Sequence, residues 1–210
     1  MNRESKSPWP IFAVLVALMI GTTLAWRATL GFRAFTWESY RRLSVLQHPL
    51  AMPMLQLQDQ DGRIFTPTLY EGKVLLVNFI YTRCPSLCTY SGTVYGRLLA
   101  ALANDERRSQ VRLLSISLDP DHDTPERMRE YRRRYIRAST ESWRVARPLS
   151  AQAGAGLLAR FGVVSIPDGL GGIKHNAAIH LIDRHGQLVR IISETDTVDI
   201  LSAVDALYRK

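Results

Sequence analysis

The chain has 210 residues, 46% of them apolar, which is enough to bury one sizeable hydrophobic core and leave an appendage outside it. A formal net charge of +8 favours anionic partners, yet no nucleic-acid-binding motif accompanies it, so we predict no nucleic-acid partner. Two cysteines are too few for a small domain held together by disulfides, and a chain of this length does not need that device.

The first element is an uncharged N-terminal segment that runs from Pro8 to Trp26. As a helix it would rise about 28 Å, close to the thickness of a bilayer's hydrocarbon core, with tryptophans at both ends where interfacial indoles are found. We therefore predict a short cytoplasmic tail over residues 1–8 and a transmembrane anchor over residues 9–26, with the rest of the chain exported. A signal peptide that is cleaved, leaving a secreted protein, is the alternative.

Residues 27–50 are predicted to form a juxtamembrane tether. Phe32, Phe35, Trp37 and Tyr40 recur there at loosely helical spacing, with arginines between them. That pattern is typical of an amphipathic helix on a membrane surface. Packing on the following domain and a plain linker are the alternatives.

A single domain is predicted over residues 51–210. In chain order, its expected elements are a hairpin turning at Asp61–Gly62, a buried strand over 73–82, a helix over 86–103, a buried strand over 111–119, helices over 124–136 and 150–162, two strands over 177–183 and 187–192, and a helix over 197–209. The strand–helix–strand crossovers imply a parallel part of the sheet, and the hairpin between the last two strands implies an antiparallel part. Together they predict an α/β fold of the thioredoxin-like sandwich type.

The two cysteines, Cys84 and Cys88, follow the first buried strand directly, at the carboxyl edge where open α/β sheets place their sites. Residues four apart share one face of a helix, so both sulfurs can reach one ion or each other. The helix N-terminus and the neighbouring Arg83 favour the thiolate, so we expect two exposed thiols of low pKa. A crosslink closing so small a loop adds little stability, which argues against a structural disulfide and leaves redox chemistry and metal binding open.

A metal site here needs a third ligand. Two thiolates alone suit zinc poorly, whereas two thiolates and an imidazole suit a soft ion such as Cu(I). Among the five histidines, His48 and His180 are interpreted as solvated or structural, and His185 lies in a hairpin turn far from the cysteines. His175 lies in a glycine-rich loop before a predicted strand, and in a thioredoxin-like fold that loop passes beside the cysteines, which makes His175 the candidate.

Three segments, VNFIYTRCPSLC, LLSISLDPDHDTPE and KHNAAIHLID, follow one another in an order that resembles the Sco/SenC family of copper-binding proteins. The match covers most of residues 50–210, and the N-terminal anchor also fits. The resemblance implies a thioredoxin-like fold and copper ligands at Cys84, Cys88 and His175. It also implies that Asp119 and Asp123, which fall on the family's acidic motif, support the site. A cap or turn role beside the next helix is the alternative for Asp123.

The resemblance implies a copper chaperone rather than an enzyme with turnover of its own. It would bind copper, as Cu(I) with Cu(II) as a second form, and deliver it to the binuclear copper site of cytochrome c oxidase during assembly. Its partners would be the copper-site subunit of the oxidase, other copper chaperones or thiol reductants, and the bacterial inner membrane, with the soluble domain facing the periplasm. A thiol–disulfide oxidoreductase that reduces the client's cysteines through the redox pair Cys84 and Cys88 is the alternative.

Two positions depart from the family pattern. Thr89 follows the second cysteine where the family often has proline, and Lys174 precedes the histidine where the family often has an acidic residue. Neither change removes a ligand. The extra positive charge of Lys174 bears on affinity and on partner choice rather than on the identity of the metal.

Overall fold

The computed structural model describes residues 9–84, 87–103, 105–136, 141–169 and 172–209. The chain divides into two compact units, Met1–Ser44 and Val45–Lys210. The predicted tail over residues 1–8 lies outside the described residues.

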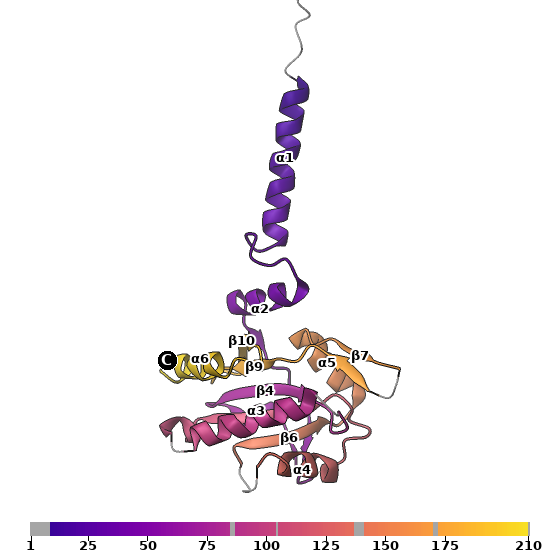
Figure 1. Cartoon of the computed structure of the whole chain (residues 1–210), viewed down its shortest axis with the longest axis vertical. Helices are drawn as coiled ribbons and strands as arrows, with labels where there is room; N and C mark the ends of the chain where they lie inside the picture. Colours follow the sequence, from indigo (N-terminus) through magenta and orange to yellow (C-terminus); the bar gives the residue numbers. More distant parts are fainter. Residues whose placement is uncertain (1–8, 85–86, 104, 137–140, 170–171, 210) are drawn as a thin grey trace, which may run out of the picture. The chain divides into compact units, whose positions relative to one another are not determined.

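The N-terminal unit is dominated by helix α1 (Trp9–Ala28), none of whose residues is buried (Figure 1). Within the described residues, α1 is the helix long and apolar enough to cross a membrane, with a mean hydropathy of 1.9 over its most apolar stretch. A signal sequence meets the same criterion, so α1 fits a membrane anchor or a signal.

Helix α2 (Trp37–Gln47) forms within the predicted tether. Its first turn is closed by a reciprocal cap, in which the amide of Ser39 donates to Oγ1 of Thr36 (3.1 Å) and the amide of Thr36 donates to Oγ of Ser39 (3.1 Å). Phe32 and Phe35 precede this helix rather than belonging to it. The helical spacing of the aromatic residues therefore predicted a helix correctly, but one that begins later.

The C-terminal unit is built on an eight-stranded mixed sheet of order β1-β10-β9-β4-β5-β6-β2-β3. Strands β4, β5 and β6 are parallel, and the other pairs are antiparallel, as the predicted crossovers and hairpins require. The strands are β1 (Leu50–Ala51), β2 (Leu57–Asp59), β3 (Ile64–Phe65), β4 (Val74–Ile80), β5 (Val111–Ser117), β6 (Trp143–Pro148), β9 (Ile179–Ile182) and β10 (Gln187–Ile192).

Helices cover both faces of this sheet. They are α3 (Leu87–Leu102), α4 (Pro125–Arg133), α5 (Ala151–Phe161) and α6 (Thr197–Tyr208), with short 3-10 turns η1 (Pro67–Tyr70) and η2 (Glu106–Ser109). Central strand β4 is buried along its whole length, and its successive side chains alternate between two core clusters. Helices α3, α4 and α6 contribute to one cluster and α5 to the other, so the predicted α/β sandwich is confirmed.

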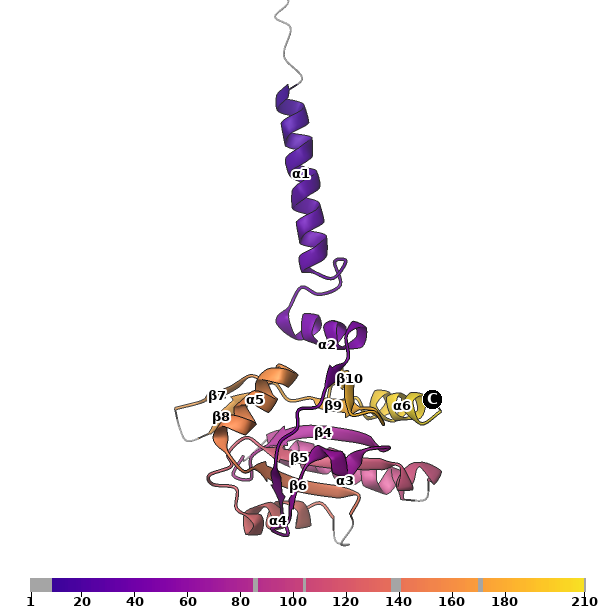
Figure 2. The ribbon, with the colours of Figure 1, turned by 180° about the vertical axis from the view of Figure 1, so that it is seen from behind.

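Two features of this unit differ from the sequence-based expectation. Strand β6 was not predicted, because Arg144 and Arg147 interrupt its apolar residues and leave no continuous apolar run and no strict alternation. The segment that carries His175 was expected to be a flexible loop, but it forms a second sheet from β7 (Ser165–Pro167) and β8 (Ile173–His175), beside α5 (Figure 2). Two hydrogen bonds between Asp168 and Gly172 close that hairpin.

Candidate metal centre

Cys84 follows β4, and Cys88 lies in the first turn of α3; we call residues 81–84 and 87–88 the cysteine turn. The amide of Cys84 donates to the carbonyl of Tyr81 (3.2 Å) and so tightens the turn. The amide of Cys88 donates to the sulfur of Cys84 (3.4 Å), and the amide of Tyr81 donates to the sulfur of Cys88 (3.4 Å). Neither cysteine forms a disulfide, and each sulfur accepts a backbone hydrogen bond, which taken by itself favours the thiolate form.

The expectation of two exposed thiols of low pKa is wrong for Cys88. Cys84 is partly exposed, but only 1% of Cys88 is exposed. Burial raises the pKa of the Cys88 thiol well above its ordinary value, and the hydrogen bond from the amide of Tyr81 opposes this only in part. Desolvation therefore outweighs the helix N-terminus, and Cys88 has to lose a tightly held proton when it binds a metal ion.

His175 is the end residue of β8, opposite Ser165 of β7. Both of its ring nitrogens are buried, and neither has a hydrogen-bond partner among the residues that the structure describes. Burial also lowers the pKa of the imidazole, which favours the neutral form. A neutral imidazole whose ring nitrogens have no hydrogen-bond partner has a lone pair free for a metal ion. Such an arrangement is unusual for a histidine that only packs in a core, so His175 and the two cysteines fit a soft metal ion.

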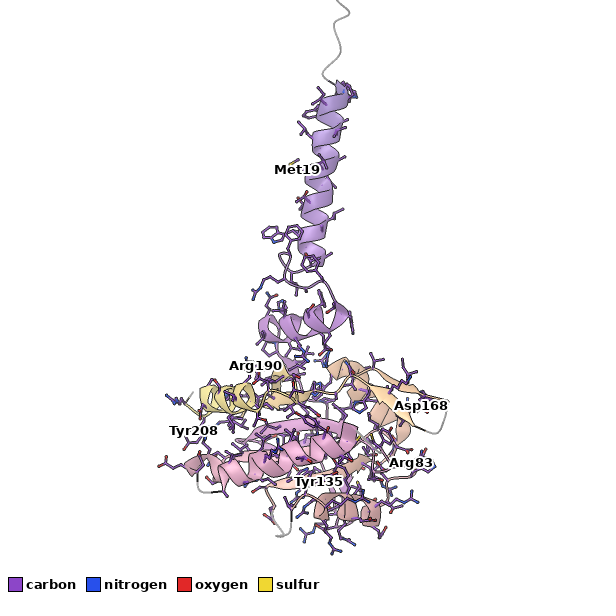
Figure 3. All side chains as sticks on the ribbon, in the orientation of Figure 1. Met19, Arg83, Tyr135, Asp168, Arg190 and Tyr208 are labelled. Carbon is purple, nitrogen blue, oxygen red and sulfur yellow. The ribbon has the colours of Figure 1, made fainter. Side chains whose placement is uncertain are left out.

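The hairpin that carries His175 is joined to the cysteine turn by a hydrogen bond. The amide of Ile173 donates to the hydroxyl of Tyr81 (3.2 Å), and Ile173 packs against the core cluster that includes Cys88. Figure 3 shows Arg83, from the turn, and Asp168, from the hairpin, at the same end of the domain.

The three candidate side chains do not form a closed site. Within the described ranges, no group of three His, Cys, Asp or Glu side chains stands in an arrangement that could hold a metal ion. Binding one ion through Cys84, Cys88 and His175 therefore requires side chains or the hairpin to move.

Asp123 is fully buried and holds the cysteine turn from the loop after β5. Its carboxylate accepts hydrogen bonds from the amide of Thr82 (3.1 Å), the hydroxyl of Thr82 (2.6 Å) and the hydroxyl of Ser117 (2.5 Å). Burial raises its pKa, although these hydrogen bonds act in the opposite direction. The N-cap of α4 is Thr124, so Asp123 does not cap that helix but hydrogen-bonds to Thr82, a residue far away in the sequence.

Asp119 braces the same turn at its surface. Its carboxylate pairs with Arg83 (2.7 Å) and accepts from Nδ1 of His122 (2.7 Å). Of the other histidines, His180 is buried with Nδ1 3.3 Å from the carbonyl of Val77, and His185 is exposed in the β9–β10 turn, in agreement with their predicted roles.

Sequence reasoning missed two tyrosines that touch the turn. Tyr81 contacts both cysteines and the hairpin, and the hydroxyl of Tyr131 on α4 donates to the carbonyl of Cys88 (2.6 Å). The position of Tyr81 immediately before the cysteine motif was a usable signal. Tyr131 carried none, because its contact depends on how α4 packs against α3.

The fold and this arrangement define a thioredoxin-like α/β protein with a Cys-x3-Cys turn at the edge of its parallel strands. The family model described as SCO1/SenC matches residues 46–208, and the chain therefore belongs to the SCO1/SenC family. The SCO1 protein homolog of Bacillus subtilis is 27% identical over 155 residues, which cover 70% of this chain and 77% of that protein. A protein of Stutzerimonas stutzeri is 32% identical over 87 residues, and the match spans only 42% of that relative's length.

Solved structures agree with this assignment. A SCO1/SenC family lipoprotein from Bacillus anthracis superposes with a TM-score of 0.69 at 25% identity, over 78% of this chain and 99% of that one. ScoI of Bradyrhizobium japonicum, solved with copper bound, superposes with a TM-score of 0.64 at 26% identity, over 75% of this chain and 99% of that one.

Proposed function

We propose that this protein is a membrane-anchored copper chaperone that binds copper through Cys84, Cys88 and His175 and delivers it to the binuclear copper site of cytochrome c oxidase during assembly. Three similarities support this. The chain belongs to the SCO1/SenC family, ScoI of Bradyrhizobium japonicum binds copper, and BsSco is described as a member of the Sco family of cytochrome c oxidase assembly proteins.

The observation that carries the proposal is the buried imidazole of His175, which has no hydrogen-bond partner in the described part of the chain and lies on a hairpin tied to the cysteine turn. Two thiolates and one imidazole form a soft, low-coordinate set that Cu(I) prefers, and nitrogen–sulfur sets also bind Cu(II). Asp119 and Asp123 take supporting roles by holding the turn. Copper is the cargo here, so the chain only has to bind it and release it.

For location, we propose a cytoplasmic tail over residues 1–8, an anchor over 9–26, a tether over 27–50 and a copper-binding domain over 51–210 in the periplasm of a bacterial inner membrane. The exposed apolar helix α1 supports the anchor. The description of the Bacillus anthracis relative as a lipoprotein supports attachment to a membrane by another means. The partners would be the copper-site subunit of the oxidase, upstream copper chaperones and a thiol reductant.

Titration with Cu(I) tests the ligand set. The reduced full-length chain in detergent should bind one Cu(I), and His175→Ala should weaken that binding at least tenfold, because a soft ion loses one of three ligands. His185→Ala is the matched control, since His185 is exposed in the β9–β10 turn. Unchanged affinity in His175→Ala would exclude His175 as a ligand.

A second candidate function is reduction of a disulfide in the copper-site client. It is favoured by the contrast between the partly exposed Cys84 and the buried Cys88, and by the disulfide switch identified in BsSco. The thiolate of Cys84 would attack the client disulfide, and Cys88 would then displace the client, leaving a Cys84–Cys88 disulfide and a client dithiol. This activity should survive in His175→Ala under strict copper chelation, whereas copper delivery should not.

A further inference from the structure

The turn between α1 and α2 (residues 29–36) is fixed by hydrogen bonds to Thr29. The carbonyl of Thr29 accepts from the amides of Arg33 (3.0 Å) and Ala34 (2.9 Å). Its hydroxyl accepts from the amide of Phe32 (3.0 Å) and donates to the carbonyl of Ala25 (2.6 Å), which belongs to α1. The turn, drawn between α1 and α2 in Figure 1, therefore continues the helix as a fixed structure and not as a loose linker.

The close approach of Trp26 to Gly31 holds the turn against the end of α1. The amide of Gly31 donates to the carbonyl of Trp26 (2.8 Å), and a Cβ at residue 31 would lie only 2.7 Å from Nε1 of the indole. Gly31 also has a left-handed backbone (φ 76°), which glycine adopts without steric cost. Trp26 and the turn thus form one unit.

Aromatic rings and cations are concentrated in and beside this turn, and we call them the exit cluster. The members come from the last turn of α1, the turn itself and the first residue of α2: Trp26, Arg27, Phe32, Arg33, Phe35 and Trp37. The four rings are between 48% and 76% exposed. A concentration of exposed apolar groups of this kind marks an interaction surface.

The two arginines of the exit cluster are unpaired. Within the described part of the chain, the guanidinium groups of Arg27 and Arg33 have no hydrogen-bond or ion-pair partner, whereas Arg42 on α2 pairs with Glu38 (2.7 Å). No acidic residue occurs over residues 9–37. The exit cluster therefore offers two positive charges to an anionic partner.

The position of the exit cluster in the chain identifies its partner as a lipid surface. The cluster begins within α1, which has no buried residue and is long and apolar enough to cross a membrane. When α1 spans a bilayer, the cluster lies where the helix leaves the hydrocarbon. Aromatic rings are stable among the headgroups at that level, and cations there are attracted to anionic lipid.

We propose that the exit cluster binds the headgroup layer of a bilayer containing anionic phospholipid, so that the tether is attached to the membrane surface as far as Trp37. The four rings insert among the headgroups, and Arg27 and Arg33 pair with lipid phosphates. The free part of the tether then begins with α2, which shortens the reach of the chain after it. This inference rests on the proposed membrane anchor and adds a lipid preference to it.

The indole N–H signals of the four tryptophans test the proposal in the full-length chain, reconstituted in nanodiscs of phosphatidylglycerol or of phosphatidylcholine. The signals of Trp9, Trp26 and Trp37 are assigned by changing each one to phenylalanine, and their cross-relaxation with lipid and with water protons is measured. Trp37 should contact lipid in phosphatidylglycerol. Trp143, which is fully buried, is the internal control and should contact neither. A Trp37 signal that relaxes only with water would overturn the proposal.

The same spectra separate this proposal from the proposed anchor. Lipid contact at Trp9 and Trp26 without contact at Trp37 would leave the anchor standing and refute the attachment of the tether to the surface. Absence of lipid contact at all three tryptophans would refute the anchor and the proposal together.

The double substitution Arg27→Gln and Arg33→Gln tests the lipid preference. In phosphatidylglycerol it should lower the ratio of lipid to water cross-relaxation at Trp37 by about threefold, because each cation near an anionic surface adds to binding. Wild type in phosphatidylcholine should show a similar loss. The control substitutes two exposed arginines of the C-terminal unit, Arg97→Gln and Arg160→Gln, and should keep the wild-type ratio. Equal ratios in all four samples would overturn the preference for anionic lipid.

Discussion

The cysteine turn and the β7–β8 hairpin carry the proposed ligands, and the two regions are held in different ways. Three contacts hold the turn. The buried carboxylate of Asp123 accepts from the amide of Thr82, and the hydroxyl of Tyr131 donates to the carbonyl of Cys88. Asp119 forms an ion pair with Arg83. These contacts come from the loop after β5 and from α4. The backbone that carries two of the three proposed ligands is therefore held in place by contacts within the protein.

The β7–β8 hairpin is held to the rest of the domain by fewer contacts. All six residues of β7 and β8 are exposed or only partly buried. Its base is tied by Asn176, whose side chain accepts from the amide of Val164 (2.8 Å) and donates to the carbonyl of Gly162 (3.2 Å). This difference fits the proposed release of copper, because moving the one proposed ligand on the hairpin would lower affinity without disrupting the turn that carries the other two.

The largest effect is expected from the turn itself. Cys84→Ser should weaken Cu(I) binding at least hundredfold, because a hydroxyl is a poor ligand for a soft ion. Competition with a chromogenic Cu(I) chelator under reducing conditions measures this, with Thr89→Ser, an exposed neighbour, as control. Retention of affinity within tenfold would remove Cys84 from the ligand set.

The second largest effect is expected at Asp123, whose carboxylate holds the cysteine turn. Asp123→Asn leaves only one carbonyl oxygen to accept the donors of Thr82 and Ser117, and it should lower the free energy of unfolding by about 2 kcal/mol. Chemical denaturation measures the loss, and Asp121→Asn, in the exposed part of the same loop, serves as the control. Equal stability of the two variants would mean that Asp123 does not hold the turn.

A smaller effect is expected at the base of the hairpin. Asn176→Ala removes the bonds to Val164 and Gly162, and it should lower the free energy of local opening of β7 and β8 by about 1 kcal/mol while leaving β5 unchanged. Amide hydrogen exchange followed by mass spectrometry compares the two regions in one sample. Equal acceleration in both would show that the hairpin does not open on its own.

The smallest effect concerns Glu194, whose carboxylate accepts from the hydroxyl of Ser91 (2.5 Å), one turn along α3 from Cys88. Burial raises the pKa of Glu194, although the hydrogen bond from Ser91 opposes the shift. The folded state thus holds the proton more tightly than the unfolded chain. This stabilising contribution is present below the unfolded pKa of about 4.3 and is lost as pH rises through the folded pKa.

Glu194→Gln imitates the protonated carboxyl at every pH. The variant should be about 1 kcal/mol more stable than wild type at pH 7 and equal to it near pH 4. Thermal or chemical unfolding at both pH values checks the difference, with the exposed Glu71 changed to Gln as control. A variant that is less stable at pH 7 would mean that the ionised carboxylate is well compensated in the folded state.

The sequence predicted the parts of the fold that local pattern determines. Strands β4 and β5 are continuous apolar runs, α4 starts at a Thr-Pro cap, and Gly162 ends α5 in the left-handed conformation. It did not predict β6 or the β7–β8 hairpin, since β7 and β8 are short and β6 contains two arginines in six residues.

In the candidate site, too, local sequence pattern predicted some features and tertiary packing determined the others. The spacing of Cys84 and Cys88 and the family resemblance named the candidate ligands in advance. The burial of Cys88, the bond of Asp123 to Thr82 and the bridge made by Tyr81 arise only when distant segments pack together. Helix-terminus arguments about thiol pKa failed at Cys88 because they contain no information on desolvation.

X-ray absorption at the copper edge of the Cu(I)-loaded full-length chain identifies the ligands of the proposed copper site. We expect two sulfur ligands and one nitrogen ligand in wild type, with the nitrogen lost in His175→Ala and retained in the control His185→Ala. A site of sulfur ligands alone in wild type, or a nitrogen ligand that persists in His175→Ala, would contradict it.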